Sequence, residues 1–152
     1  MTKTLPWLVI IVVGLIFSGC QDHVAVPTST NGFSANLEPD GKFLIRYKNS
    51  HQKPVLLNTY APDYVVREKD GDKRLLRNED KHVAPSDEDW MNIEPNGEIT
   101  ISIWAWNGAV LFPTNPGKYV IVRSEGSPMP QTLLKKGLID AGADFPPELT
   151  VE

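Results

Sequence analysis

Few side chains in this sequence are of the types that do chemistry. The three histidines, His23, His51 and His82, have no spacing to one another or to an acidic residue that is typical of a metal site. We therefore expect each imidazole at the solvated surface. The chain has one cysteine, Cys20, which has no disulfide partner within the chain. It has no Gly-x-Ser-x-Gly elbow, so no motif identifies a nucleophile, and we expect neither a catalytic nor a metal centre.

A run of three acidic residues, Asp87-Glu88-Asp89, suggests a cation site because calcium takes several oxygen ligands. The run lacks the spacing of acidic residues around a glycine that a calcium-binding loop requires. A solvated loop between Asn78 and Asn92 is the simpler interpretation, with Ser86 or Asp87 as the cap of one helical turn.

Two tryptophans share one face of the clearest predicted strand, Glu98 to Trp106. Alternation places four residues of that strand, Ile99, Ile101, Ile103 and Ala105, on one face, and Trp104 and Trp106 on the other. If the isoleucines face the core, the tryptophans face outward and are candidates for partner binding. The alternative is that the tryptophans are buried within the protein itself, because a C-terminal helix covers them with Leu133, Leu134 and Leu138.

The apolar run from Leu5 to Phe17 ends at Ser18-Gly19-Cys20. As a helix its 13 residues would rise about 20 Å, short of a hydrocarbon core about 30 Å thick. The arrangement resembles the lipobox of bacterial lipoproteins, although Phe17 stands where that family usually has leucine. The resemblance implies a signal peptide over residues 1–19, cleavage before Cys20, and a thioether-linked diacylglycerol plus an amide-linked acyl chain, such as palmitate, on Cys20.

The residues after Cys20 give a further expectation about location. Gln21, rather than an aspartate, follows the cysteine, which by resemblance to enteric lipoproteins favours the periplasmic face of the outer membrane over the inner membrane. Residues 20–32 are polar and lack an apolar face, so we expect a lipidated flexible tether. Its end-to-end distance is about 20 Å.

Net charge and chain length limit the kind of partner and the number of domains. The net charge is −4, and removal of residues 1–19, with Lys3 as their only charged residue, makes it −5. This acidity argues against nucleic acid as a partner. The remaining length fits one domain.

Thirteen prolines and eleven glycines separate short apolar runs, which is typical of strands joined by turns. The sequence predicts an all-β fold: an antiparallel β-sandwich of about seven strands over residues 33–126, with a short helix in a C-terminal extension over 127–152. The expected strands are Phe33–Leu37, Lys42–Asn49, Pro54–Tyr60, Asp63–Lys69, Lys73–Arg77, Glu98–Trp106 and Lys118–Ser124. Ile93 is expected to begin another short strand, the helix is expected over Gln131–Ala141, and the tail Pro146–Glu152 is expected to be extended.

The stretch from Phe43 to Ser124 resembles bacterial immunoglobulin-like domains. The resemblance rests on turn chemistry, at Asn49-Ser50, Asp70-Gly71 and Pro95-Asn96-Gly97. The run Pro116-Gly117-Lys118-Tyr119-Val120 is similar to the tyrosine corner, in which a tyrosine hydroxyl bonds to nearby backbone. The order of motifs is also similar to that of the intracellular proteinase inhibitor family, but inhibitory activity does not follow from shared turns.

These observations together predict a membrane-anchored lipoprotein that acts by binding a protein partner in the periplasm, in envelope assembly, inhibition or immunity. The first alternative is a cell-wall or glycan hydrolase using carboxylates from the Asn78–Asn92 loop. The second is a carbohydrate-binding module that stacks sugars on Trp104 and Trp106.

Overall fold

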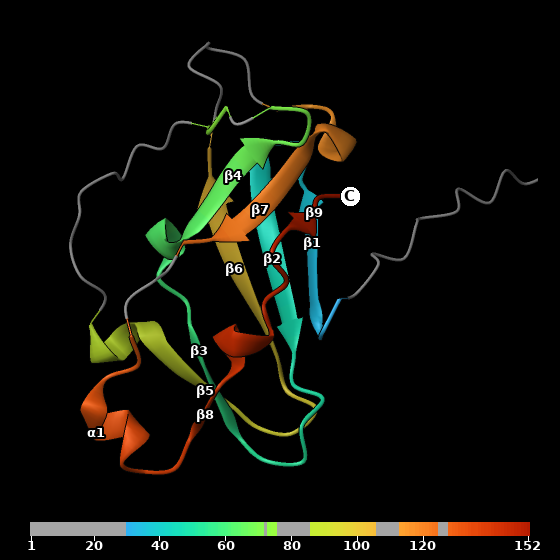
Figure 1. Cartoon of the computed structure of the whole chain (residues 1–152). Helices are drawn as coiled ribbons and strands as arrows, with labels where there is room; N and C mark the ends of the chain where they lie inside the picture. The colour runs from blue at the N-terminus through green and yellow to red at the C-terminus, as the bar shows by residue number, and fades with distance from the viewer. Residues whose placement is uncertain (1–29, 72, 76–85, 106–112, 125–127) are drawn as a thin grey trace, which may run out of the picture.

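The computed structural model describes residues 30–71, 73–75, 86–105, 113–124 and 128–152, which form a mainly β structure (Figure 1). This confirms the predicted all-β class. The described part holds nine short strands in three sheets, where the sequence indicates about seven. The strands are β1 Phe33–Leu37, β2 Lys42–Lys48, β3 Val55–Asn58, β4 Tyr64–Glu68, β5 Trp90–Ile93, β6 Glu98–Trp104, β7 Tyr119–Arg123, β8 Ile139–Asp140 and β9 Leu149–Thr150. The helical elements are α1 Gln131–Leu134 and the 3₁₀ turns η1 Ala61–Asp63, η2 Asp87–Asp89, η3 Pro116–Lys118 and η4 Ala141–Asp144.

The first sheet has the antiparallel order β1-β2-β6. Its register pairs Ile45 of β2 with Ala35 of β1 and Ile101 of β6. These three side chains are buried, as is Ile103 of β6. The predicted alternation on β6 is therefore confirmed, and β2 has the same alternation, because a period of two sends every second side chain to the same face.

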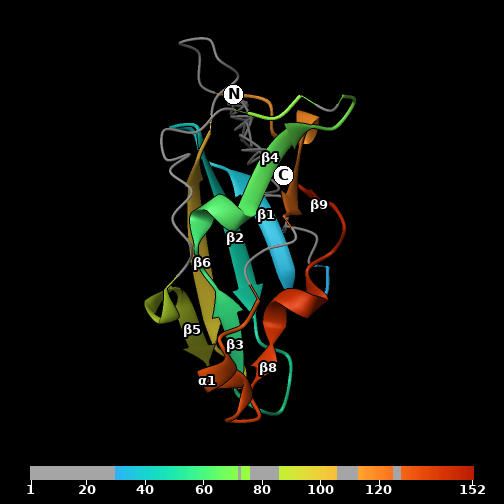
Figure 2. The ribbon, with the colours of Figure 1, turned by 60° about the vertical axis from the view of Figure 1, so that its left-hand side comes forward.

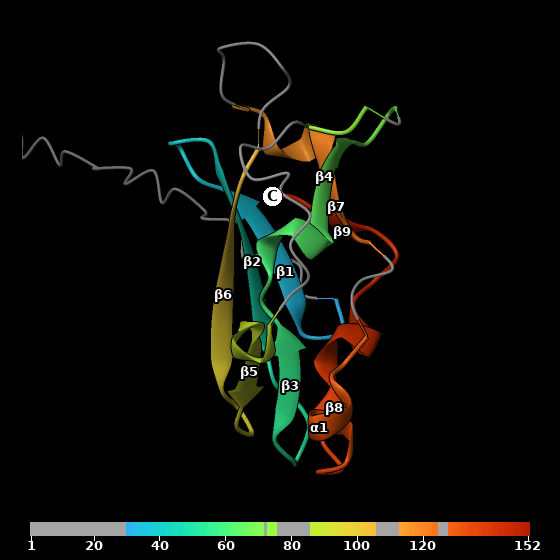
Figure 3. The same cartoon turned by 90° about the vertical axis from the view of Figure 1, so that its left-hand side faces the viewer.

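The second sheet has the order β4-β7-β9 and the third has the order β5-β3-β8. Figure 3 shows β6, β2 and β1 as one layer, with β4, β7 and β9 as a second layer facing it. Figure 2 shows β5, β3 and β8 together at the end of the molecule where α1 lies.

One main core fills the space between the layers. It includes Phe43 and Ile45 of the first sheet and Val66 and Ile121 of the second, all almost fully buried. The ring of Phe145, beyond η4, lies 4.9 Å from that of Phe33 and 5.5 Å from that of Tyr64. The C-terminal segment thus contacts aromatic residues of both layers, and such pairs contribute about 0.5–1.5 kcal/mol each beyond the area they bury.

The C-terminal tail joins the two layers along one edge. The N–H of Leu37 donates to the carbonyl of Glu152, and the N–H of Glu152 donates to the carbonyl of Ala35, both at 3.0 Å. Ala35 and Val151 form a parallel bridge. The predicted extended tail is confirmed, and it satisfies backbone groups of β1 that would otherwise face solvent.

Two glycine-containing turns fix the first sheet. Asn96 has φ 63° in the turn Glu94–Gly97, which the N–H of Gly97 closes on the carbonyl of Glu94 at 2.8 Å. Proline at the second position and asparagine at the third suit such a turn. Gly32 has φ 85°, and a Cβ there would lie 2.7 Å from the carbonyl oxygen of Lys48.

One strand prediction is wrong, and a second is described only in part. Residues Trp90–Asn92 were expected in a loop, but they form β5, which ends at Ile93 instead of beginning there. The strand is missed because four residues are too few to show a period, and it is held by pairing with the fully buried β3. In the expected strand Lys73–Arg77, the described residues 73–75 return antiparallel to β4: Arg74 forms a bridge with Arg67, and the N–H of Leu75 donates to the carbonyl of Val66 at 2.9 Å.

The predicted C-terminal helix is present but much shorter than expected. The α-helix α1 ends at Leu134, and Gly137 follows with φ 68°. A glycine in the left-handed region ends a helix because it turns the chain without steric strain. The residues beyond it pair with β3 as β8 and then form η4, which buries Ala141.

Candidate functional site

The outer face of the first sheet carries the alternate residues of β2 and β6. The register sets Lys42 opposite Trp104, Leu44 opposite Ser102, Arg46 opposite Thr100 and Lys48 opposite Glu98. We call this set of eight residues, together with Ser34 and Asn36 of β1, the outer face. Among the described residues β6 pairs with β2 alone, so the outer face ends at an edge strand.

Trp104 is the largest apolar side chain of the outer face, and 46 % of its surface is exposed. The Lys42 ammonium lies 4.8 Å from the centre of its ring. A cation above an aromatic ring at an exposed site contributes about 0.5–1 kcal/mol. This contact orients the indole and leaves much of it in solvent.

Asp40 holds Lys42 in place. The Lys42 N–H donates to Oδ1 of Asp40 at 3.1 Å, and the Lys42 ammonium lies 3.3 Å from Oδ2. The backbone N–H is the main reason that the pKa of the Asp40 carboxyl lies below its usual value, and the ammonium lowers it further. Lys42 is therefore engaged both by an anion and by the Trp104 ring.

The C-terminal segment packs elsewhere. Leu133 and Leu138 pack against a second small core formed by Leu56, Trp90 and Met129, while Leu134 is exposed. Figure 1 shows α1 at the end of the molecule where β6 begins, whereas Trp104 is the last residue of β6. The prediction that a C-terminal helix covers Trp104 is thus wrong. The helix is too short, and Leu133 and Leu138 pack on β3 and β5 instead. Trp106 lies outside the described residues.

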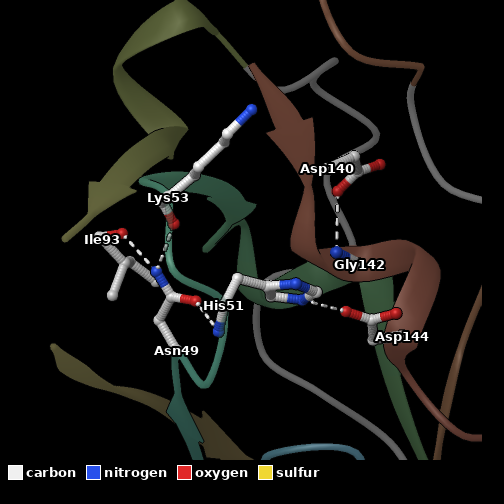
Figure 4. Close-up of polar contacts among 7 residues, drawn as sticks. All are labelled: Asn49, His51, Lys53, Ile93, Asp140, Gly142 and Asp144. Atoms are coloured by element: carbon white, nitrogen blue, oxygen red, sulfur yellow. Dashed lines mark hydrogen bonds and ion pairs between the residues drawn. The ribbon is translucent and has the colours of Figure 1, made fainter. Parts of the chain in front are cut away.

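A second polar arrangement joins the β2–β3 loop to η4 (Figure 4). Asn49 is fully buried, and its amide donates to the carbonyls of Lys53 at 3.0 Å and Ile93 at 2.9 Å. Its Oδ1 accepts from the N–H of His51 at 2.9 Å. These bonds fix the loop and present the imidazole of His51, whose Nε2 lies 2.9 Å from Oδ2 of Asp144.

The other residues of this arrangement hold η4. Asp140 Oδ1 accepts from the N–H of Gly142 at 2.8 Å and so caps the turn. Asp140 Oδ2 lies 3.7 Å from the guanidinium of Arg123, which packs so close to Gly142 that a Cβ there would overlap it. We call His51, Asp144, Asp140, Arg123 and Asn49 the η4 junction.

A histidine–aspartate pair is a common part of hydrolytic sites, and here it also links the β2–β3 loop to η4. His51 and Asp144 are bonded to each other at one nitrogen, and each keeps 38 % of its side chain exposed. Two shallow pockets are described, of about 250 and 230 Å³, and neither contains a residue of the η4 junction. The sequence predicts His51 at the surface, as observed, but it does not reveal the partner, because 93 residues separate His51 from Asp144.

The remaining candidates are distributed as follows. Asp87, Glu88 and Asp89 form η2, as the capping interpretation predicts, and the Asp89 carboxylate accepts from the N–H of Ser86 at 2.7 Å. Within the described ranges, no group of three histidine, cysteine or acidic residues is placed to hold a metal ion. Cys20, His23 and His82 lie outside the described residues.

The hydrogen bond typical of a tyrosine corner is made by a different tyrosine from the one expected. Tyr119 packs its ring edge to face on Phe43, with ring centres 5.5 Å apart. Tyr64, at the start of β4, donates its hydroxyl to the carbonyl of Asn58 at 2.6 Å. Burial raises the pKa of Tyr64 far above its usual value, so this hydroxyl stays protonated and remains a donor.

Comparison with known proteins adds no relative. No protein family, curated protein or solved structure matches the chain. In the part of the chain that the structure describes, no helix has the length and apolar character needed to cross a membrane.

Proposed function

We propose that this protein is a lipid-anchored, non-catalytic binding domain whose outer face, centred on Trp104, binds a protein partner in the periplasm. The observation that carries the proposal is the exposure of Trp104 on an edge strand, oriented by Lys42. Tryptophan is enriched among the residues that dominate protein interfaces, because it buries a large area with little loss of side-chain freedom.

The anchor is part of the proposal and is supported by sequence alone. Cys20 follows a signal-like apolar run, and only twelve residues lie between it and Phe33, the first residue of β1. Two or three acyl chains at Cys20 would give a stable hold on the membrane. The outer membrane is the expected location, and a Cys20→Ser variant that no longer incorporates labelled palmitate but is still exported would support the anchor.

We also propose that the domain is an immunoglobulin-like sandwich. Its first sheet, β1-β2-β6, has the order of strands A, B and E of that fold, and β4-β7-β9 has the order of strands C, F and G. β3 and β4 then act as one strand C interrupted by η1. β5 takes the place of strand D in sequence but pairs with β3 rather than with β6, which leaves β6 at the edge.

A carbohydrate-binding module is the second candidate, favoured by the exposed Trp104 ring, on which a sugar could stack. The hydrolase has less support. The carboxylate of Asp89 in the Asn78–Asn92 loop already accepts two bonds from Ser86.

The direct test is capture of crosslinked partners from cells with Trp104→Ala, using Leu134→Ala as a matched control. Both side chains are 46 % exposed, but Leu134 lies on α1, away from the first sheet. We expect Trp104→Ala to lose a specific protein that wild type and Leu134→Ala retain. Retention of that protein by Trp104→Ala would contradict the proposed site, and glycan binding that Trp104→Ala abolishes would favour the second candidate.

A further inference from the structure

Three cations of the outer face lie in one row on β2. The row consists of Lys42, Arg46 and Lys48. They are four and two residues apart on β2, so their side chains point to the same side of the strand. Glu98 is the only acidic residue among the ten that make up the outer face, which therefore has a formal charge of +2. The whole chain has a net charge of −4, so positive charge is concentrated on the face that also exposes Trp104.

The cations of the row differ in how far they are already engaged. Lys42 contacts Asp40 and Trp104. Within the described ranges, Arg46 has no ion pair, and its neighbours in register are Ser34 and Thr100, which are short and uncharged. Arg46 therefore presents an exposed guanidinium whose donors are open to a carboxylate.

Acidic residues border the row at both ends. Asp40 lies beside Lys42, and Glu98 lies opposite Lys48. A broad anionic plane such as a membrane would meet these carboxylates together with the cations. A narrow segment that lies along β2 meets the row of cations first, since Glu98 stands on the neighbouring strand, about 4.8 Å away.

Resting on the proposed function, we infer that the segment of the protein partner bound at the outer face is extended and acidic. Its carboxylates pair with Arg46 and Lys48, and an apolar side chain packs on the exposed part of Trp104. Side chains on alternate positions of an extended segment repeat at the spacing of the β2 row, so two acidic residues two apart can reach Arg46 and Lys48 together.

The test uses the full lipidated chain in neutral detergent micelles and a fluorescent peptide of alternating glutamate and serine that ends in phenylalanine. We expect anisotropy to report binding that weakens as salt is added. Arg46→Glu should weaken it about tenfold or more, since charge reversal replaces a paired contact by repulsion. Lys136→Glu, a reversal at an exposed position after α1, is the matched control and should bind as wild type.

Several results would overturn the inference. These are no binding of the acidic peptide, equal weakening by Arg46→Glu and Lys136→Glu, or binding to micelles doped with phosphatidylglycerol that exceeds binding to the peptide. Capture of the cellular partner separates the two proposals. If it depends on Trp104 but is unchanged by Arg46→Glu, the acidic segment is wrong and the proposed function stands, whereas independence from Trp104 removes the proposed function itself.

Discussion

His51 Nε2 lies 2.9 Å from Oδ2 of Asp144, and this contact ties the loop after β2 to the 3₁₀ turn η4 near the C-terminus. The pair is an attachment of one segment to the other. Since both side chains are 38 % exposed, solvent screens their attraction.

We expect Asp144→Asn to lower the free energy of unfolding by less than about 1 kcal/mol. The larger effect should be local, with faster amide hydrogen exchange in residues 139–145. Glu88→Gln, an exposed change in η2, is the control for the removal of one negative charge. Unchanged exchange in η4 with Asp144→Asn would contradict the attachment.

Asn49 should contribute much more to stability than the ion pair it supports. Asn49→Ala removes three side-chain hydrogen bonds at a fully buried position and leaves the carbonyl of Ile93 without its amide donor. We expect a loss of about 3 kcal/mol, because a buried group left without its partner costs about 1–3 kcal/mol. Urea unfolding measures it, and Asn92→Ala, an exposed asparagine on β5, should change stability by less than about 0.5 kcal/mol. Equal losses for the two variants would show that Asn49 is not the support of the loop.

Buried tyrosines predict loss of stability at alkaline pH. Burial raises the pKa of Tyr64 above its usual 10, and it also raises the pKa values of Tyr47 and Tyr119. The folded state favours the neutral phenols, so their contribution is complete below pH 10 and is lost as pH rises from 10 toward the folded pKa values.

The unfolding free energy should therefore fall above pH 10, while absorbance shows delayed ionisation of the buried tyrosines. Tyr64→Phe should lower stability at neutral pH, since it removes the bond to Asn58, and should fall less steeply above pH 10. A profile for Tyr64→Phe parallel to that of wild type would contradict the assignment.

Gly32 is required by its backbone conformation. In Gly32→Ala the new Cβ would lie 2.7 Å from the carbonyl oxygen of Lys48, at a φ of 85°. We expect a loss of about 1–3 kcal/mol in the free energy of unfolding. Gly71→Ala is a matched control, because its Cβ would meet nothing within 4 Å. Comparable melting temperatures for the two variants would show that the start of β1 tolerates a side chain.

The sequence predicted the parts of the fold that depend on local periodicity. Strands β1, β2 and β6 were located within one or two residues, and the outward direction of Trp104 followed from the alternation of Ile101 and Ile103. Short elements could not be predicted from the sequence. β5 and β8 form because they pair with β3, and they are too short to show a periodic pattern of apolar residues.

The candidate site, too, could be predicted from the sequence only in part. Residues of the outer face could be named from sequence, since neighbours at a period of two share a face. The pairs across the η4 junction could not, because His51–Asp144 and Arg123–Asp140 depend on how the C-terminal segment packs. Gly137 ended the predicted helix early and sent the following residues to β3 instead of over Trp104.

The measurement that tests the central claim most directly is site-specific photocrosslinking in cells from Ser102, an exposed outer-face position two residues before Trp104. A benzophenone side chain at Ser102 should give one discrete protein adduct, and the same group at Thr132, exposed on α1, should not. The adduct should disappear when Trp104→Ala is combined with the crosslinker at Ser102. No adduct from Ser102, or the same adduct from Thr132, would contradict the assignment of the outer face as the binding surface.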